Sequence, residues 1–330
     1  MEEQDKTHYL YLYKYNNLLY HQVQHYNNQL KDKEDYCIYT DTDSVFYPAV
    51  PLVKNRYPDA DIEDEEFMRK QILEVAKEVQ DYINKGYDYF ASKFLNIRDE
   101  HRFDIKQECV ARSAFWVTKK RYGQWIINDG GVKCDKLDVK GLDIVRSNFP
   151  PAMRDLMTQV LKDILGSKPK DEIDEKIVAF QKEMKYLSIY DIALPTGVKG
   201  IQKYIERNKR SYNFSNKKQS FTTMKKGTPV HVKSSIRYND LLKYFKEQNA
   251  EPIRNSEKIK WVYLKQNPFN IETIAFKGYD DPPVILEFIE KYINHDKLFD
   301  GALKKKIKMF YEALNWDLPV DKENTIERFF

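Results

Sequence analysis

The sequence lacks any apolar run close to the roughly 20 residues that a transmembrane helix needs. Its first ten residues, MEEQDKTHYL, are too acidic and polar for a signal peptide. Cysteine is scarce: Cys37, Cys109 and Cys134 are scattered, and no CxxC pair or His/Cys cluster accompanies them. This scarcity excludes a disulfide framework and a zinc knot, and it suits a soluble protein of a reducing cytoplasm.

Neither sign of charge dominates, because the sequence contains 55 Lys and Arg residues and 51 Asp and Glu residues, which gives a net charge of +4. The distribution is uneven, since acid collects in residues 59–67 and base in several short segments. These segments are TKKRY, ERNKRSYNFSNKKQS, MKKG and ALKKKIK. They are typical of a protein that meets a polyanion on one face. For any single segment, a solvated lysine-rich surface explains the pattern at least as well.

The first part of the chain mixes helical and strand patterns. Apolar residues recur in steps of three and four over 12–30, which predicts an amphipathic helix. The segments YCIYT and VFYPAV predict two strands around the turn DTDS. A long helix is expected from Asp64 onward, with acidic residues at its start and Gly86 as a candidate end. Alternating residues over 101–127 predict further antiparallel strands.

The rest of the chain shows clearer boundaries. NDGG at 128–131 predicts a tight turn. Prolines and glycines bracket the first of four expected helices, and two later segments look like strands. We expect helices over 150–166, 171–187, 283–294 and 301–314, and strands over 228–239 and 258–265. The double proline at 150–151 places a domain boundary near Asn148, giving domains 1–148 and 149–330 in an α+β fold.

Asp41 and Asp43 interrupt the aromatic and β-branched run DYCIYTDTDSVFYPAV. In an extended chain, residues two apart point to one side, so both carboxylates can face one point. Hard cations such as Mg²⁺ bind to one or two carboxylates together with substrate phosphates. For an isolated Asp-x-Asp, an ordinary hairpin turn is the better explanation, because Asp, Thr and Ser favour turns. The surrounding motifs therefore have to decide between the two interpretations.

Three motifs in order resemble those of the family B DNA polymerases. YTDTDS at 39–44 resembles motif C (Y-x-D-T-D-S), a hairpin of the palm domain. FWVTKKRYG at 115–123 is similar to the KKRY element on a palm strand near the primer. VKGLDIVRSNFPP at 139–151 is similar to the K-G-x-x-x-V-R segment that leads from palm to thumb. Residues 226–242 and 264–276 look more loosely like the thumb of the phage replicative branch.

The resemblance implies a DNA-directed DNA polymerase with two Mg²⁺ ions. By this resemblance Asp41 and Asp43 are catalytic, with Asp43 as the direct metal ligand and Asp41 as a weaker or supporting one. Glu108 precedes KKRY at a spacing where many members carry a metal-approaching Glu, although its context IKQECV departs from the usual pattern. The expected DNA-binding residues are Lys119, Lys120, Arg121, Tyr122, Lys140 and Arg146. Their phosphate contacts would position primer–template DNA without reading its sequence.

Several parts of the family's site are missing from this sequence. It has no S-L-Y-P-S-like motif A, no K-x-x-x-N-S-x-Y-G-like motif B and no exonuclease carboxylate motif. We therefore expect the C-terminal portion of a polymerase, part of the palm plus the thumb, encoded by a naturally split gene. A second chain would bring exonuclease, fingers and motif A, and would be required for dNTP addition. The apolar stripe of 12–30 would face that chain or pack within this one.

The last residues, KENTIERFF, are a second functional candidate. Ile326, Phe329 and Phe330 have a spacing that puts them on one side of a helical turn. Polymerases of the resembled branch end in a short apolar peptide that binds the sliding clamp, so we expect these three residues to be clamp-binding. A tail that folds back onto the thumb is the alternative.

Two other functions remain open. A non-catalytic DNA- and clamp-binding module derived from a polymerase would keep the same basic motifs, but it gives no reason to keep the two carboxylates. A protein-primed polymerase fits less well with the long thumb and the aromatic tail. The expected location is the cytoplasm of a phage-infected bacterial host, with no membrane partner.

Overall fold

The computed structural model describes residues 37–97, 101–209 and 224–319. Contacts divide the chain into two units, Met1–Val110 and Ala111–Phe330. Helices and antiparallel sheets mix in it, as the α+β prediction states. The predicted boundary after Asn148 lies within the second unit and stays a prediction. Among the described residues, no helix combines the length and apolarity that crossing a membrane requires.

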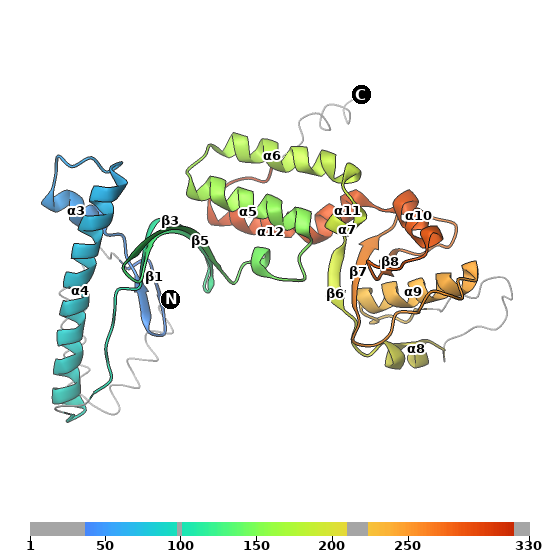
Figure 1. Ribbon diagram of the computed structural model, residues 1–330, viewed down its shortest axis with the longest axis horizontal. Helices are drawn as coiled ribbons and strands as arrows, with labels where there is room; N and C mark the ends of the chain where they lie inside the picture. The colour runs from blue at the N-terminus through green and yellow to red at the C-terminus, as the bar shows by residue number, and fades with distance from the viewer. Residues whose placement is uncertain (1–36, 98–100, 210–223, 320–330) are drawn as a thin grey trace. The chain divides into compact units, whose positions relative to one another are not determined.

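The first unit contains a small hairpin and a long helix (Figure 1). Strands β1 (Tyr39–Asp41) and β2 (Ser44–Phe46) pair antiparallel, which confirms the predicted hairpin. Helix α3 (Val50–Arg56) precedes helix α4 (Glu65–Phe94). A small apolar core joins the two helices; its buried residues are Ala49, Val53, Met68 and Val75.

Helix α4 begins where the sequence predicts and ends later. The Asp64 side chain accepts a hydrogen bond from the Phe67 amide, and acidic residues fill the first turn. Gly86 does not end the helix, so that expectation was wrong. A glycine inside a helix lowers helix stability by about 1 kcal/mol relative to alanine. The helix-forming residues on both sides of Gly86 compensate for this loss.

The segment 101–108 was predicted as a strand but has no regular structure. Its backbone groups bind side chains of α4 instead of a neighbouring strand. Asn84 accepts from the Ile105 amide at 2.8 Å and donates to the Ile105 carbonyl at 3.0 Å. Gln80 accepts from the Gln107 amide at 2.8 Å. These side-chain bonds satisfy polar groups that a β-ladder would otherwise use.

The second unit opens with an antiparallel sheet whose strand order follows the chain (Figure 1). Its strands are β3 (Cys109–Thr118), β4 (Arg121–Asp129) and β5 (Val132–Lys140). The predicted NDGG turn joins β4 to β5: Gly130 and Gly131 have positive φ, and the Asn128 side chain accepts from the Gly131 amide. The 3₁₀ helix η1 (Asp143–Val145) follows the sheet.

Helices then continue the second unit. α5 (Pro151–Leu165) and α6 (Lys170–Glu183) confirm two of the expected helices, and a 3₁₀ turn η2 (Met184–Tyr186) and the short α7 (Ile189–Ile192) follow. A second antiparallel sheet has the order β6-β7-β8. Its strands are β6 (Leu194–Gly197), β7 (Lys258–Tyr263) and β8 (Thr273–Phe276), so the strand expected at 258–265 is confirmed.

The remaining helices follow, and α9 and α11 among them contact this sheet. They are α8 (Ile201–Lys209), α9 (Val230–Phe245), α10 (Pro283–Tyr292), α11 (His295–Phe299), the π-helical segment η3 (Asp300–Lys304) and α12 (Lys305–Ala313). The two expected C-terminal helices are thereby confirmed. One apolar core extends from β3 through the helices to α12. Phe115 of β3 and Phe310 of α12 meet edge to face in it, with ring centroids 5.5 Å apart.

The strand predicted at 228–239 is wrong, because α9 occupies that stretch. The alternation of Val230 and Val232 with polar residues imitates a strand. The helix is enclosed on most sides, since Val232, Ile236 and Leu241 are buried although they do not share one helical face. The Ser234 and Ser235 hydroxyls donate to carbonyls one turn earlier, at 2.8 Å each. These hydrogen bonds offset the free energy that burying two unpaired serine hydroxyls would cost.

Candidate functional site

The acidic pair lies at the tip of the β1–β2 hairpin. Asp41 is paired with Ser44, so the loop itself consists of Thr42 and Asp43. The Asp43 amide donates to the Asp41 carbonyl at 2.7 Å, and Thr42 has φ +57°. A β-branched residue at positive φ is strained, and such strain persists only where the surrounding structure fixes it, as in tight turns and at functional sites. The extended i, i+2 arrangement expected from the sequence is therefore replaced by a tight turn.

The two carboxylates fit part of a Mg²⁺ site. The Asp43 side chain is exposed and that of Asp41 is partly exposed, so both are open to a cation and its waters. Their oxygens are hard donors of the kind that Mg²⁺ binds. In the described part of the chain, no group of three or more His, Cys, Asp or Glu converges on a common point. The pair therefore offers only part of the oxygen coordination shell that a Mg²⁺ ion takes.

Glu108 immediately precedes β3 and is exposed to solvent. It belongs to the irregular segment that follows α4 and not to a strand. Its role as a metal ligand stays a prediction.

The KKRY element forms the turn of the β3–β4 hairpin and does not lie wholly on a strand. Lys119 and Lys120 are the exposed turn residues, and Lys120 has φ +61°. Arg121 and Tyr122 begin β4, and the Tyr122 ring lies 6.0 Å from that of Trp116 on β3. Two lysines on a protruding turn suit contact with a phosphate backbone.

The sheet brings two of the three motifs together. Tyr122 of KKRY is the register partner of Lys140, the lysine of the K-G-x-x-x-V-R segment. Gly141 follows with φ +66°, and a Cβ on it would lie 2.1 Å from the Lys120 carbonyl oxygen. Glycine is required there because the backbone of the lysine turn occupies the space of a side chain. The two motifs are thus one local structure.

Asp143 lies between the predicted DNA-binding arginines and was missed in the sequence. Arg121 Nη2 donates to it at 2.8 Å, Lys306 Nζ lies at 2.8 Å and Arg146 Nη1 at 3.3 Å. Burial raises the pKa of Asp143, but the Lys306 hydrogen bond and the three positive charges outweigh it and hold the pKa below its usual value. The spacing Asp143-x-x-Arg146 was the available sequence signal for this contact.

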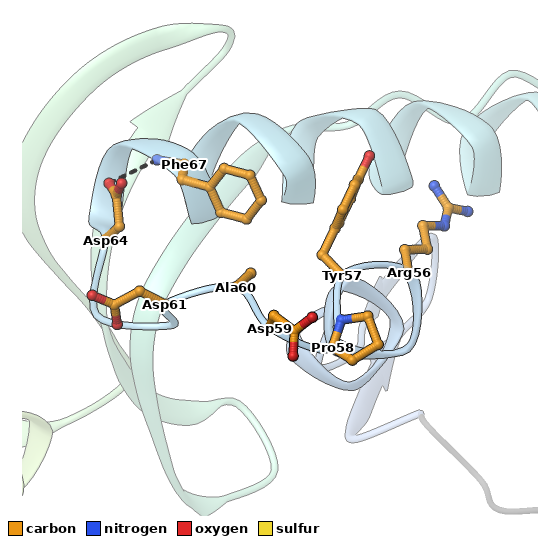
Figure 2. Close-up of a pocket in the computed structure, with 8 residues that line it drawn as sticks. All are labelled: Arg56, Tyr57, Pro58, Asp59, Ala60, Asp61, Asp64 and Phe67. Carbon is orange, nitrogen blue, oxygen red and sulfur yellow. Dashed lines mark hydrogen bonds between the residues drawn. The ribbon is translucent and has the colours of Figure 1, made fainter.

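A cavity of about 500 Å³ lies elsewhere in the first unit, in the loop between α3 and α4 (Figure 2). Its wall includes Asp59, Asp61 and Asp64, and the Tyr57 and Phe67 rings meet edge to face beside it. Two of these carboxylates have local structural tasks: Asp64 caps α4, and Asp61 accepts from the Glu63 amide at 2.9 Å. None of the predicted site residues lines this cavity.

Two predicted features fall outside the described residues. These are the amphipathic helix over 12–30 and the clamp-binding candidates Ile326, Phe329 and Phe330.

Comparison with known proteins supports the resemblance at the level of the family. A family model described as DNA polymerase family B matches residues 11–307. No curated protein sequence matches the chain.

Proposed function

Because the chain belongs to DNA polymerase family B, we propose that it supplies the metal-binding hairpin and the primer–template grip for template-directed dNTP addition. The observation that carries the proposal is the strained DTDS hairpin, which presents Asp41 and Asp43 to solvent. In this proposal residues 1–148 are the C-terminal part of a palm, and residues 149–330 are a thumb of the phage replicative type.

The residues of this chain divide the work between metal binding and DNA positioning. Two bound Mg²⁺ ions would neutralise charge as the primer 3′-hydroxyl attacks the dNTP α-phosphate and pyrophosphate leaves. Asp43 at the hairpin tip is the direct ligand, Asp41 supports it, and Glu108 is a further candidate. The exposed Lys119–Lys120 turn holds the DNA backbone, which positions the 3′-hydroxyl.

We further propose that the complementary segments lie on a second chain that carries exonuclease, fingers and motifs A and B. The hairpin pair is too small a ligand set for two ions, and the sequence contains no fingers lysine pattern. The second chain would complete the coordination and bind the incoming triphosphate.

This assignment predicts negligible primer extension by the isolated chain and at least about a thousandfold more after co-expression with its complementary chain, because about 4 kcal/mol of metal-dependent stabilisation depends on both. Extension of a labelled primer on a short template, followed by gel electrophoresis, measures this. The complementary chain alone is the control. Robust extension by the isolated chain would contradict the split site.

The C-terminal peptide is proposed to bind a sliding clamp. Deleting the last six residues, 325–330, is expected to remove clamp-stimulated processivity and to spare extension on short primers, since a short peptide with apolar residues at helical spacing is a typical partner anchor. Product lengths on long primed single-stranded DNA, with and without clamp, measure the effect. Replacing Glu327 and Arg328 by Ala is the matched control, because it keeps the apolar residues. Unchanged processivity after the deletion would refute the clamp role.

A further inference from the structure

One carboxylate in the second unit joins cations from three separate elements. Asp143 of η1 accepts hydrogen bonds from Arg121 at the start of β4 and from Lys306 of α12, and it forms an ion pair with Arg146 just after η1. We call these four residues the Asp143 cluster. Three positive charges face one negative charge, so the cluster remains a positively charged site. Arg121 and Lys306 are distant from Asp143 in the sequence, whereas Arg146 is three residues away. Lys306 belongs to the basic segment ALKKKIK but to none of the three motifs that resemble the polymerase family.

Arg121 has a second contact that ties the hairpin to the last helix. Its Nη1 donates to the sulfur of Met309 on α12 at 3.3 Å. Below it, Phe115 and Phe310 pack edge to face. The β3–β4 hairpin and α12 are therefore held together by both a polar and an apolar contact. These two contacts connect α12 to the hairpin that ends in the lysine turn.

The cluster is layered from the core to solvent. The Asp143 side chain is 12% exposed and that of Arg121 is 27% exposed, whereas Lys306 and Arg146 reach 33% and 54%. The apolar residues Leu142, Phe149 and Met157 line the space behind Asp143. Asp143 thus anchors the cluster from inside, and the charges that a ligand can reach are Lys306 and Arg146.

We propose that Asp143 is a positioning residue which holds Lys306 and Arg146 as one phosphate-binding site, so that α12 takes part in gripping primer–template DNA beside the Lys119–Lys120 turn. The inference rests on the proposed function, because the ligand is a phosphate of the DNA backbone. Two long cationic side chains lose rotamer freedom and repel each other when they gather on one phosphate. A carboxylate that already holds them together reduces both costs before DNA binds.

The direction in which Asp143→Asn changes DNA affinity distinguishes a positioning role of Asp143 from an effect of net charge alone. Asp143→Asn removes a negative charge and makes the cluster more positive by one unit. If bulk electrostatics governed binding, this variant would bind the polyanion more tightly. Loss of the ion pairs that orient Lys306 and Arg146 predicts weaker binding instead.

The test measures binding of the full chain to a fluorescein-labelled primer–template duplex by fluorescence anisotropy over a series of salt concentrations. Lys306→Met and Asp143→Asn are each expected to weaken binding by about three- to tenfold and to reduce the salt slope by about one. The double variant is expected to lose little more than either single variant, because both act through one contact. The matched control is Lys308→Met, which removes a lysine of the same helix that pairs with Glu312. It should change affinity less than twofold.

The outcomes distinguish this inference from the proposed function. Tighter or unchanged binding by Asp143→Asn, or equal losses in Lys306→Met and Lys308→Met, would overturn the inference while DNA binding stands. A wild-type chain without salt-dependent duplex binding would overturn both. Thermal unfolding of each variant identifies a folding defect, and if Asp143→Asn shows one, the comparison of Lys306→Met with Lys308→Met decides the question.

Discussion

Replacing Asp43 by Ala in the assembled polymerase is expected to reduce primer extension by about a thousandfold or more. Asp43 lies exposed in the two-residue loop of the hairpin, where its carboxylate can reach a cation directly. Removing a metal ligand forfeits about 4 kcal/mol or more of charge stabilisation in the transition state. DNA affinity should change less than about threefold, because we assign the phosphate contacts to the basic residues.

Single-turnover extension of a labelled primer at saturating dNTP measures the chemical step, and anisotropy on the same duplex measures affinity. Asp59→Ala is the matched control, since Asp59 is an exposed aspartate of the same unit that lines the cavity of Figure 2. It should leave both quantities unchanged. Full extension by Asp43→Ala would favour the alternative in which the chain is a non-catalytic DNA- and clamp-binding module.

Local rules predicted those parts of the fold that depend on neighbouring residues. The DTDS hairpin, the NDGG turn and the proline-started helix α5 follow from turn and cap preferences within a few residues. The positive φ of Thr42 did not follow, because it depends on the strand register that places only two residues in the loop. The candidate carboxylates were thus predicted, but their strained presentation was not.

Other features depend on contacts between distant residues. The segment 101–108 looks like a strand until Asn84 and Gln80 of α4 bind its backbone. The α9 stretch alternates like a strand in sequence, but it forms a helix that is buried on most sides. Of its three partners, only Arg146 is close to Asp143 in the sequence. The contacts of Asp143 with Arg121 and Lys306 require the folded chain. Sequence motifs therefore indicated the chemistry, and the packing that organises it came from the structure.

The same reasoning explains why the KKRY and K-G-x-x-x-V-R motifs occur together. Register pairing places Tyr122 opposite Lys140, and the Lys120 carbonyl then lies directly over Gly141. A glycine in one motif thus accommodates the backbone of the other. The backbone of the lysine turn packs against Gly141, the residue that follows β5. This contact fixes the position from which Lys119 and Lys120 extend.

Gly141→Ala is consequently expected to lower the free energy of unfolding of the second unit by about 2–5 kcal/mol. Positive φ costs a non-glycine residue about 1–2 kcal/mol, and the Cβ 2.1 Å from the Lys120 carbonyl oxygen forces backbone to move, which costs about 1–3 kcal/mol more. Gly130→Ala is the matched control: its φ is +58°, against +66° at Gly141, but nothing lies within 4 Å of its Cβ. Only the conformational cost of about 1–2 kcal/mol applies there.

Urea denaturation followed by tryptophan fluorescence measures both variants, since Trp116 and Trp125 lie in the sheet next to the lysine turn. An unchanged m-value shows that the folded and unfolded states keep their compactness. Gly141→Ala should also weaken duplex binding, because the displaced backbone carries Lys119 and Lys120, whereas Gly130→Ala should not. Equal losses of stability in the two variants would mean that the Lys120 carbonyl does not confine Gly141. A destabilised Gly141→Ala that still binds DNA normally at low temperature would separate the turn from the DNA contact. Loss of both properties in Gly141→Ala alone would identify this glycine as the support of the lysine turn.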